Sequence, residues 1–388
     1  MYNFTFHVPT KVFFGDGAVS NVAGEIQRFG RRVLFCYGGG SIKRNGIYND
    51  VVRELKSAGI AYFEHAGISP NPTLAQVRAG IAKAKEHACD FILGVGGGSV
   101  IDCVKAISAG VSNNIDAWEL ILKPENISAA LPVGVVLTMA ATGSEMDCFG
   151  VISNTDTKEK LGFGSPLVLP KFAIMDPKYT FSVPKHQTAA GIADIMSHVF
   201  ENYFSLNDGA YLQNRFAEAV LKTCIHYGPI AYREPENREA RANLLWANSW
   251  AINGLLNSGK NTAWSVHPME HELSAFYDIT HGVGLAILTP RWMEYVLDDT
   301  TVGSFADFAE NVWNITSGDP MQKAKEAIQR TYQFFELLEI PMHLRDVGIG
   351  EEHLQEMAKA AIAHKGGAIA GFKTLDVSDV LEIYRRSL

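Results

Sequence analysis

The chain has 388 residues, of which 47% are hydrophobic and 20% are charged, a composition typical of an ordinary globular protein. Its 34 basic and 42 acidic residues give a formal net charge of −8, which argues against a nucleic-acid partner and against attraction to an anionic membrane. The length exceeds what one hydrophobic core usually supports, so two domains are expected.

Residues 1–14 lack a basic segment followed by a long apolar segment, and we interpret them as an edge strand rather than a secretory signal. The longest apolar stretch, residues 129–141, contains Pro132 and Gly134 and falls short of the ~20 residues that cross a bilayer. The 5 cysteines occur singly, with no C-x-x-C pair. This pattern predicts reduced thiols in a cytoplasmic protein.

In the first half of the chain, short β-branched runs alternate with helical patterns, as in a parallel sheet. Strands are predicted at 32–37, 90–95, 132–138 and 172–176, and helices at 47–58 and from Ser99. After Pro184 the chain shows long amphipathic patterns, among them 188–201, 210–226 and 238–256. We therefore predict an α/β domain at 1–184, with a mainly parallel sheet, and an all-helical domain at 185–388.

A glycine-rich turn follows the first of these strands. It consists of Gly38, Gly39, Gly40 and Ser41, and Lys43 and Arg44 come close behind. An acidic residue at such a strand end commonly holds the adenosine ribose and rejects a 2′-phosphate, and this turn has none. The turn therefore predicts NADP(H) in preference to NAD(H), unless Lys43 and Arg44 point to solvent.

Two further turns suit a nucleotide. The segment 94–99 leaves a strand and opens a helix, where glycines let a phosphate approach the backbone and the helix N-terminus favours negative charge. Asp102 and Lys105 on that helix either reach the cofactor or form a solvated face. The segment 138–144 places hydroxyl groups and a glycine at another strand end. Each turn could also be ordinary turn chemistry.

The helical half contains a candidate metal site. Asp194 and His198 are spaced i,i+4 within a helical pattern and project from one face; His267 lies beside a predicted helix start at Pro268, and His281 opens another apolar segment. Three neutral imidazoles and one carboxylate leave a divalent cation with a net charge near +1. Such ligands suit Zn, Fe(II), Mn, Co or Ni. The alternative is that each histidine is a hydrogen-bonded core residue.

The predicted ligands and the glycine-rich turns fall in different domains, so we expect the active site in a cleft between them. His271, one turn after His267, suits proton exchange near neutral pH, or it orients a ligand instead. Four side chains are either the apolar wall of the pocket or part of the core: Phe149, Phe163, Trp264 and Met269.

The chain resembles the iron-containing (group III) alcohol dehydrogenases in five motifs that occur in the same order. These are the segments 94–105 and 138–145, the Asp194 and His198 pair, and the segments 267–271 and 281–282. The segment 37–41 resembles in particular the clade of NADPH-dependent butanol dehydrogenases and aldehyde reductases. The likeness extends from Pro9 to Leu381. It implies a dehydroquinate synthase-like architecture, in which 1–184 is the dinucleotide-binding domain and 185–388 is the all-helical, metal-binding domain. It also implies one divalent metal ion, Fe(II) or Zn, and a homodimer.

The resemblance also implies roles for individual residues. Asp194, His198, His267 and His281 would bind the metal, although catalytic zinc usually has three protein ligands. Other residues would bind the nucleotide: Gly96, Gly97, Gly98 and Ser99 at the diphosphate, Asp102 near the nicotinamide, Asn71 on the adenosine side, and Thr138, Thr142 and Lys160 elsewhere. Lys160 could instead belong to a charged hairpin. Met146 and Asp147 depart from the family pattern, which leaves any cofactor contact at position 147 in doubt.

The function expected from these patterns is a metal-dependent, NADP(H)-linked alcohol dehydrogenase or aldehyde reductase that interconverts primary alcohols and aldehydes, with His271 as the catalytic proton relay. One alternative is a glycerol dehydrogenase or a dehydroquinate synthase-like cyclase, although no dense basic cluster accompanies the ligands. A second alternative is a noncatalytic protein that binds metal or nucleotide.

Overall fold

The computed structural model describes residues 1–205 and 209–388, and its contacts divide the chain into two compact units. The α/β unit comprises His7–Val183 and Pro235–Ser249; the helical unit comprises Met1–Phe6, Pro184–Glu234 and Trp250–Leu388. Between Val183 and Pro184 the chain passes from the α/β unit to the helical unit, whereas the boundary expected from the sequence follows residue 184. The contacts also assign 235–249 to the α/β unit and 1–6 to the helical unit.

A parallel sheet forms the centre of the α/β unit, with the described strands in the order β1-β8-β5-β4-β2-β3. Their bounds are β1 (Lys11–Phe14), β2 (Arg32–Tyr37), β3 (Ala61–His65), β4 (Phe91–Gly96), β5 (Val133–Leu137) and β8 (Phe172–Met175). The N-terminal edge strand is shorter than predicted and begins after Pro9, which has no N–H to donate. A separate antiparallel hairpin joins β6 (Phe149–Asn154) to β7 (Glu159–Gly164).

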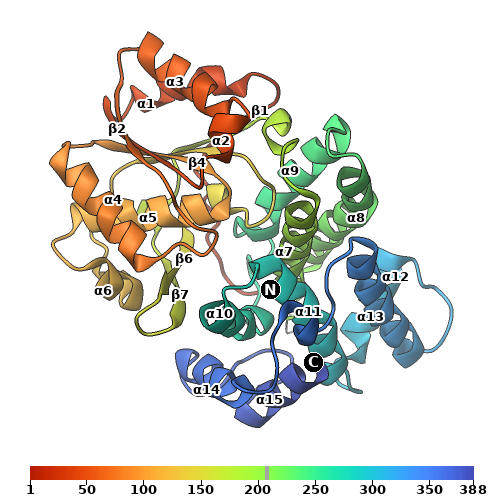
Figure 1. Ribbon diagram of the computed structural model, residues 1–388. Helices are drawn as coiled ribbons and strands as arrows, with labels where there is room; N and C mark the ends of the chain where they lie inside the picture. The colour runs from red at the N-terminus through yellow and green to blue at the C-terminus, as the bar shows by residue number, and fades with distance from the viewer. Residues whose placement is uncertain (206–208) are drawn as a thin grey trace. The chain divides into compact units, whose positions relative to one another are not determined.

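Helices cover both faces of this sheet (Figure 1). Alternate side chains of each strand point to opposite faces, so Leu34 and Cys36 enter one core, whereas Val33 and Phe35 enter the other. The helices of the first core are α4 (Leu74–Glu86), α5 (Gly98–Ser112) and α6 (Ala117–Leu122); those of the second are α1 (Val22–Ile26), α2 (Ser41–Arg44) and α3 (Ile47–Ser57). The predicted α/β architecture is confirmed.

The second unit is built from helices. They are α7 (Lys185–Tyr203), α8 (Tyr211–Arg233), α10 (Val266–Tyr277), α11 (His281–Val296), α12 (Val302–Trp313), α13 (Pro320–Leu337), α14 (Leu354–His364) and α15 (Val377–Arg386). Most of α9 (Arg238–Ile252) lies in the α/β unit. None of the helices in the described parts of the chain has the length and apolarity that a membrane crossing requires.

Candidate functional site

Asp194 and His198 lie one turn apart on α7, and both are buried. The Nδ1 atom of His198 is 3.5 Å from Oδ1 of Asp194, as the i,i+4 spacing predicts for side chains on one helix face. Burial and the neighbouring imidazoles of His267, His281 and His271 hold the pKa of His198 well below its ordinary value. His198 is therefore neutral, which is the form of imidazole that binds metal.

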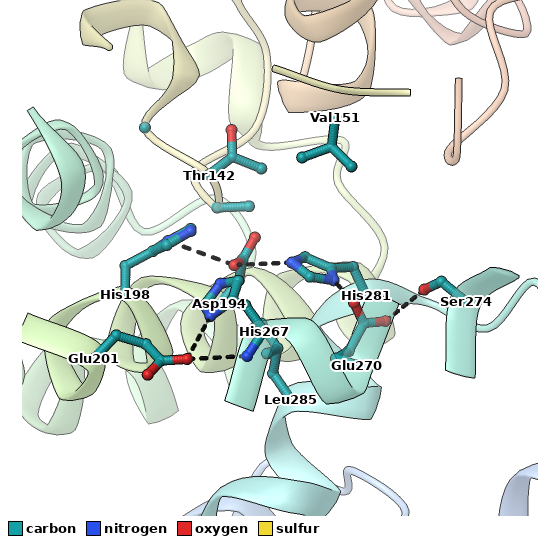
Figure 2. Close-up of polar contacts among 12 residues, drawn as sticks. Thr142, Val151, Asp194, His198, Glu201, His267, Glu270, Ser274, His281 and Leu285 are labelled. Carbon is teal, nitrogen blue, oxygen red and sulfur yellow. Dashed lines mark hydrogen bonds and ion pairs between the residues drawn. The ribbon is translucent and has the colours of Figure 1, made fainter. Parts of the chain in front are cut away.

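Helices α10 and α11 bring His267 and His281 to the same place (Figure 2). Asp194, His267 and His281 each present a ligand atom within 4.8 Å of the others. His198 falls outside this limit, but its ring centroid is 4.8 Å from that of His267. The structure thus gathers all four predicted ligands in the helical unit, three of them in a tighter group.

Two imidazole nitrogens support a metal at this position. Nδ1 of His198 and Nε2 of His267 are buried and make no hydrogen bond within the described residues. A buried polar atom without a partner is unfavourable unless a ligand satisfies it. Since the donors are three nitrogens and a carboxylate, they fit a first-row divalent cation.

Glu201, which the sequence analysis did not select, holds His267 in place. Its carboxylate is 2% exposed and accepts the backbone N–H groups of Ser265, Val266 and His267 at 2.8, 2.8 and 2.9 Å, at the start of α10. The ring Nδ1 of His267 lies 3.0 Å from the same carboxylate. Because Nδ1–H donates to Glu201, Nε2 is left to face Asp194 and His281.

Glu270 orients the ring of His281, as Glu201 orients that of His267. It is fully buried, and its carboxylate accepts hydrogen bonds from Nδ1 of His281 and from the Ser274 hydroxyl (Figure 2). Nε2 of His281 then faces Asp194, 3.9 Å from its Oδ1. With these two carboxylates included, the charge around a bound divalent ion falls from near +1 to near −1.

His271 and Trp264 border the same group of residues. The His271 ring is half-buried, with its centroid 5.8 Å from that of His281 and 6.4 Å from that of His267. The Trp264 ring centroid lies 4.6 Å from that of His267. Met269, by contrast, is fully buried, and its carbonyl accepts the Tyr384 hydroxyl, so it belongs to the core.

In the α/β unit, two of the glycine-rich turns lie beside each other. They follow the adjacent parallel strands β2 and β4, from which the chain continues in opposite directions across the sheet, to β3 and to β5. A Cβ at Gly38 would stand 3.2 Å from the Ile68 carbonyl oxygen and 3.9 Å from the Val100 side chain. Doubly wound sheets commonly bind dinucleotides where the chain leaves two adjacent strands in opposite directions, as it does here.

The other nucleotide candidates surround the second turn. A Cβ at Gly98 would stand 2.3 Å from Thr142, and the Thr138 N–H donates to the Gly96 carbonyl at 3.0 Å. The Ser99 hydroxyl donates to the carbonyl of Pro70, which precedes Asn71. The structure therefore brings four separate parts of the chain to one edge of the sheet.

Lys160 lies on the β6–β7 hairpin, in agreement with the alternative that it belongs to a hairpin. Its side chain is nevertheless buried, since the residue is only 6% exposed. The hairpin approaches the Asn71 segment, because the N–H of Ser153, the β6 partner of Lys160, donates to the Pro72 carbonyl at 2.9 Å. Phe163 on the same hairpin is buried, whereas Phe149 is 56% exposed.

Lys105 explains why an aspartate stands at position 147, where the sequence departs from the family pattern. Lys105 is fully buried and is not part of a solvated face. Its ammonium group donates to Asp147 at 2.5 Å and to the Ser144 hydroxyl at 2.8 Å. Ser144 in turn donates to Asp102 at 2.6 Å, and the Val151 N–H also donates to Asp102, at 3.0 Å. Asp147 thus belongs to a buried network that holds Asp102 in place.

Helix α9 supports the same loop from the other side. The side-chain oxygen of Asn248 accepts the N–H groups of Ala141 and Gly143 at 2.8 and 2.7 Å. Its amide nitrogen donates to the buried Glu145 at 2.9 Å. These bonds explain why residues 235–249 belong to the α/β unit, although they follow α7 and α8 of the helical unit.

Two models of one known protein family match almost the whole chain. The model of the iron-containing alcohol dehydrogenases matches residues 9–177, and the C-terminal model of the same family matches residues 188–388. The chain belongs to the iron-containing alcohol dehydrogenase family. It is therefore an oxidoreductase of alcohols and aldehydes that uses a nicotinamide cofactor and a divalent metal, and the cyclase and noncatalytic alternatives are set aside.

Individual members of this family cover almost the whole chain. The chain is 53% identical to NADH-dependent butanol dehydrogenase A of Clostridium acetobutylicum, over all of both chains. It is 40% identical to the NADPH-dependent aldehyde reductase YqhD of Escherichia coli, over 94% of each. The crystal structure of NADH-dependent butanol dehydrogenase A from Thermotoga maritima has a TM-score of 0.95 and 38% identity, over 100% of this chain and 99% of that one.

Proposed function

We propose that this chain reduces aldehydes and oxidises primary alcohols with NADP(H), at a metal held by Asp194, His198, His267 and His281. The observation that carries the proposal is the convergence of these ligands in front of Glu201 and Glu270. An Fe(II) or Zn ion bound there would polarise the carbonyl oxygen, and the nicotinamide would exchange the hydride.

The chain's own residues then have defined tasks. Glu201 and Glu270 fix the tautomers of His267 and His281, so that both Nε2 atoms remain available. The ring of Trp264 packs against that of His267 and would limit the access of water to it. His271 accepts the hydroxyl proton during oxidation and returns it during reduction, since it borders both His267 and His281.

The open glycine turn supports the choice of NADP(H). Apart from the adjoining residues of the chain, no described atom lies within 4 Å of where a Cβ would stand at Gly39 or Gly40, so the turn leaves room for a 2′-phosphate. Gly96, Gly97, Gly98 and Ser99 would face the diphosphate. The remaining nucleotide contacts would come from Ser41, Asn71, Asp102, Thr138, Thr142 and Lys160.

The test combines metal analysis with turnover. Purified protein is analysed for Fe and Zn and is then assayed with a panel of short aldehydes, using NADPH and NADH separately. We expect aldehyde-dependent oxidation of NADPH that disappears on chelation and returns with the added metal. Full metal occupancy without turnover of any aldehyde or alcohol would contradict the proposal, and faster turnover with NADH would contradict the cofactor preference.

We further propose a cytoplasmic homodimer. The N-terminal segment exposes Met1, Tyr2, Phe4 and Phe6, and the start of α8, against which it lies, exposes Tyr211, Leu212 and Phe216. An apolar patch of this kind is typical of a protein interface. Light scattering of the protein and of a Tyr2→Ser, Phe4→Ser variant tests this. The expected result is a dimer that weakens in the variant, and a monomeric parent protein would contradict it.

A further inference from the structure

The carboxyl ends of β2 and β3 carry a charged cluster that the sequence did not reveal. Glu64 on β3 accepts hydrogen bonds from the hydroxyl groups of Tyr37 and Tyr48, the latter at 2.5 Å. The ammonium group of Lys43 lies 3.1 Å from the same carboxylate and stacks over both tyrosine rings, 5.1 and 4.6 Å from their centroids. Tyr37 directly precedes the Gly38–Ser41 turn, so the cluster stands beside that turn.

Both charges of the pair are present at neutral pH. Burial would raise the pKa of Glu64, but the hydrogen bonds from Tyr37, Tyr48 and Lys43 outweigh it and hold that pKa below its ordinary value. Hydrogen bonds to Tyr37 and to Glu64 raise the pKa of Lys43. The Glu64 side chain is 34% exposed and that of Lys43 is 47% exposed, so each also faces the solvent from which a nucleotide arrives.

This pairing changes what Lys43 offers to a ligand. A lysine beside a glycine turn would attract an adenosine 2′-phosphate as a point charge. Here a carboxylate at 3.1 Å neutralises the lysine, so Lys43 attracts that phosphate less strongly than an unpaired lysine would. The acidic residue missing from the end of β2 is thus supplied in space by the neighbouring strand, which pairs with β2 in parallel register.

We propose that Glu64 is a specificity-determining residue: its pair with Lys43 weakens the preference of the Gly38–Ser41 turn for nucleotides that carry a 2′-phosphate. The inference rests on the proposed function in one respect, namely that the adenosine end of the cofactor lies at this turn. It needs neither the metal nor any alcohol substrate. Glu64 acts through Lys43 and does not itself have to touch the ribose.

Binding of two small probes tests this without catalysis. Calorimetry measures the dissociation constants of adenosine 2′,5′-bisphosphate and of 5′-AMP for the full chain and for the variants Glu64→Gln, Lys43→Met and the double variant. Glu86→Gln is the matched control, because it removes an equally negative charge at the exposed end of α4. Tyr48→Phe is a milder variant that removes one hydrogen bond to Glu64.

The quantity compared is the ratio of the two dissociation constants. In Glu64→Gln, we expect the ratio of the AMP dissociation constant to the bisphosphate dissociation constant to be about three- to tenfold higher than in the parent chain. Tyr48→Phe should raise the same ratio by less. Lys43→Met should reduce the preference, and Glu86→Gln should leave it within twofold.

The double variant distinguishes an action through Lys43 from a direct contact with the ribose. If Glu64 acts through Lys43, Glu64→Gln has no further effect once Lys43 is methionine. An equal effect with and without Lys43 would overturn the inference, as would a ratio that Glu64→Gln leaves unchanged. A chain that oxidises no alcohol but shows the expected ratios would contradict the proposed function and leave this inference intact.

Discussion

Glutamine in place of Glu201 would keep the size of the side chain and remove its charge. Oε1 of Glu201 accepts Val266 N, His267 N and His267 Nδ1, and Oε2 accepts Ser265 N. A glutamine oxygen can keep the first three bonds, but its NH2 group then faces the Ser265 N–H, and one charge-assisted bond is lost. The expected loss of folding stability is about 1.5–3 kcal/mol.

The same change should weaken metal binding. Without the negative charge behind it, the His267 ring is a poorer donor and is less firmly oriented, which typically lowers metal affinity about 10–100-fold. Competition with a chromophoric chelator measures this affinity. Urea unfolding of the metal-free protein measures the stability separately.

Glu272→Gln provides the matched control. Glu272 is also a buried glutamate of α10 that pairs with a histidine, His364, at 2.8 Å, but that histidine is not among the predicted ligands. Both variants should lose stability, and only Glu201→Gln should lose metal affinity. Unchanged affinity in Glu201→Gln, or an equal loss in Glu272→Gln, would refute the orienting role of Glu201.

Three further outcomes are expected. His271→Ala should lower kcat about 10²–10⁴-fold with unchanged metal content, and loss of the metal would defeat the relay role. Lys105→Met should destabilise the chain by about 3–5 kcal/mol in urea unfolding, because Asp147 is left as a buried unpaired charge, and adding Asp147→Leu should restore most of this loss. Burial, which outweighs the attraction of Lys105, raises the pKa of Asp102 from 3.8 to about 6. Between these two pKa values the folded chain keeps a proton on Asp102 that the unfolded chain has released. The free energy of unfolding should therefore fall by up to about 3 kcal/mol as the pH rises from about 4 to about 6. Asp102→Asn should remove this slope, and a slope that persists would assign it to other groups.

Local patterns predicted much of the fold. The strand at 32–37 matches β2, and the predicted strand at 90–95 differs from β4 by one residue at each end, because buried parallel strands are marked by continuous apolar runs. The helix at 210–226 was predicted too short, since α8 continues through Pro229 to Arg233. The amphipathic pattern of α9 shows that the helix has a buried face, but it does not show that this face packs in the α/β unit.

Within the candidate site, the residues that the sequence analysis missed act through partners remote in the chain. Glu201 is 66 residues from His267, and Glu64 is 21 residues from Lys43. An isolated glutamate in a helix or strand pattern is ordinarily a surface residue, and nothing local marks it as buried or paired. Asp147 departs from the nucleotide motif, and its buried partner Lys105 lies 42 residues away in the chain.

Sequence patterns are enough to predict the family, the alternation of strands and helices, and the residue types that suit a metal and a nucleotide. These properties depend on short-range periodicity and on the chemistry of individual side chains. The free nitrogen of His267 and of His281, the neutralisation of Lys105, and the carboxylate beside the Gly38–Ser41 turn become apparent only in the folded chain. Such outcomes depend on distances of about 3 Å between groups that burial and backbone packing bring together, and one-dimensional spacing does not encode them.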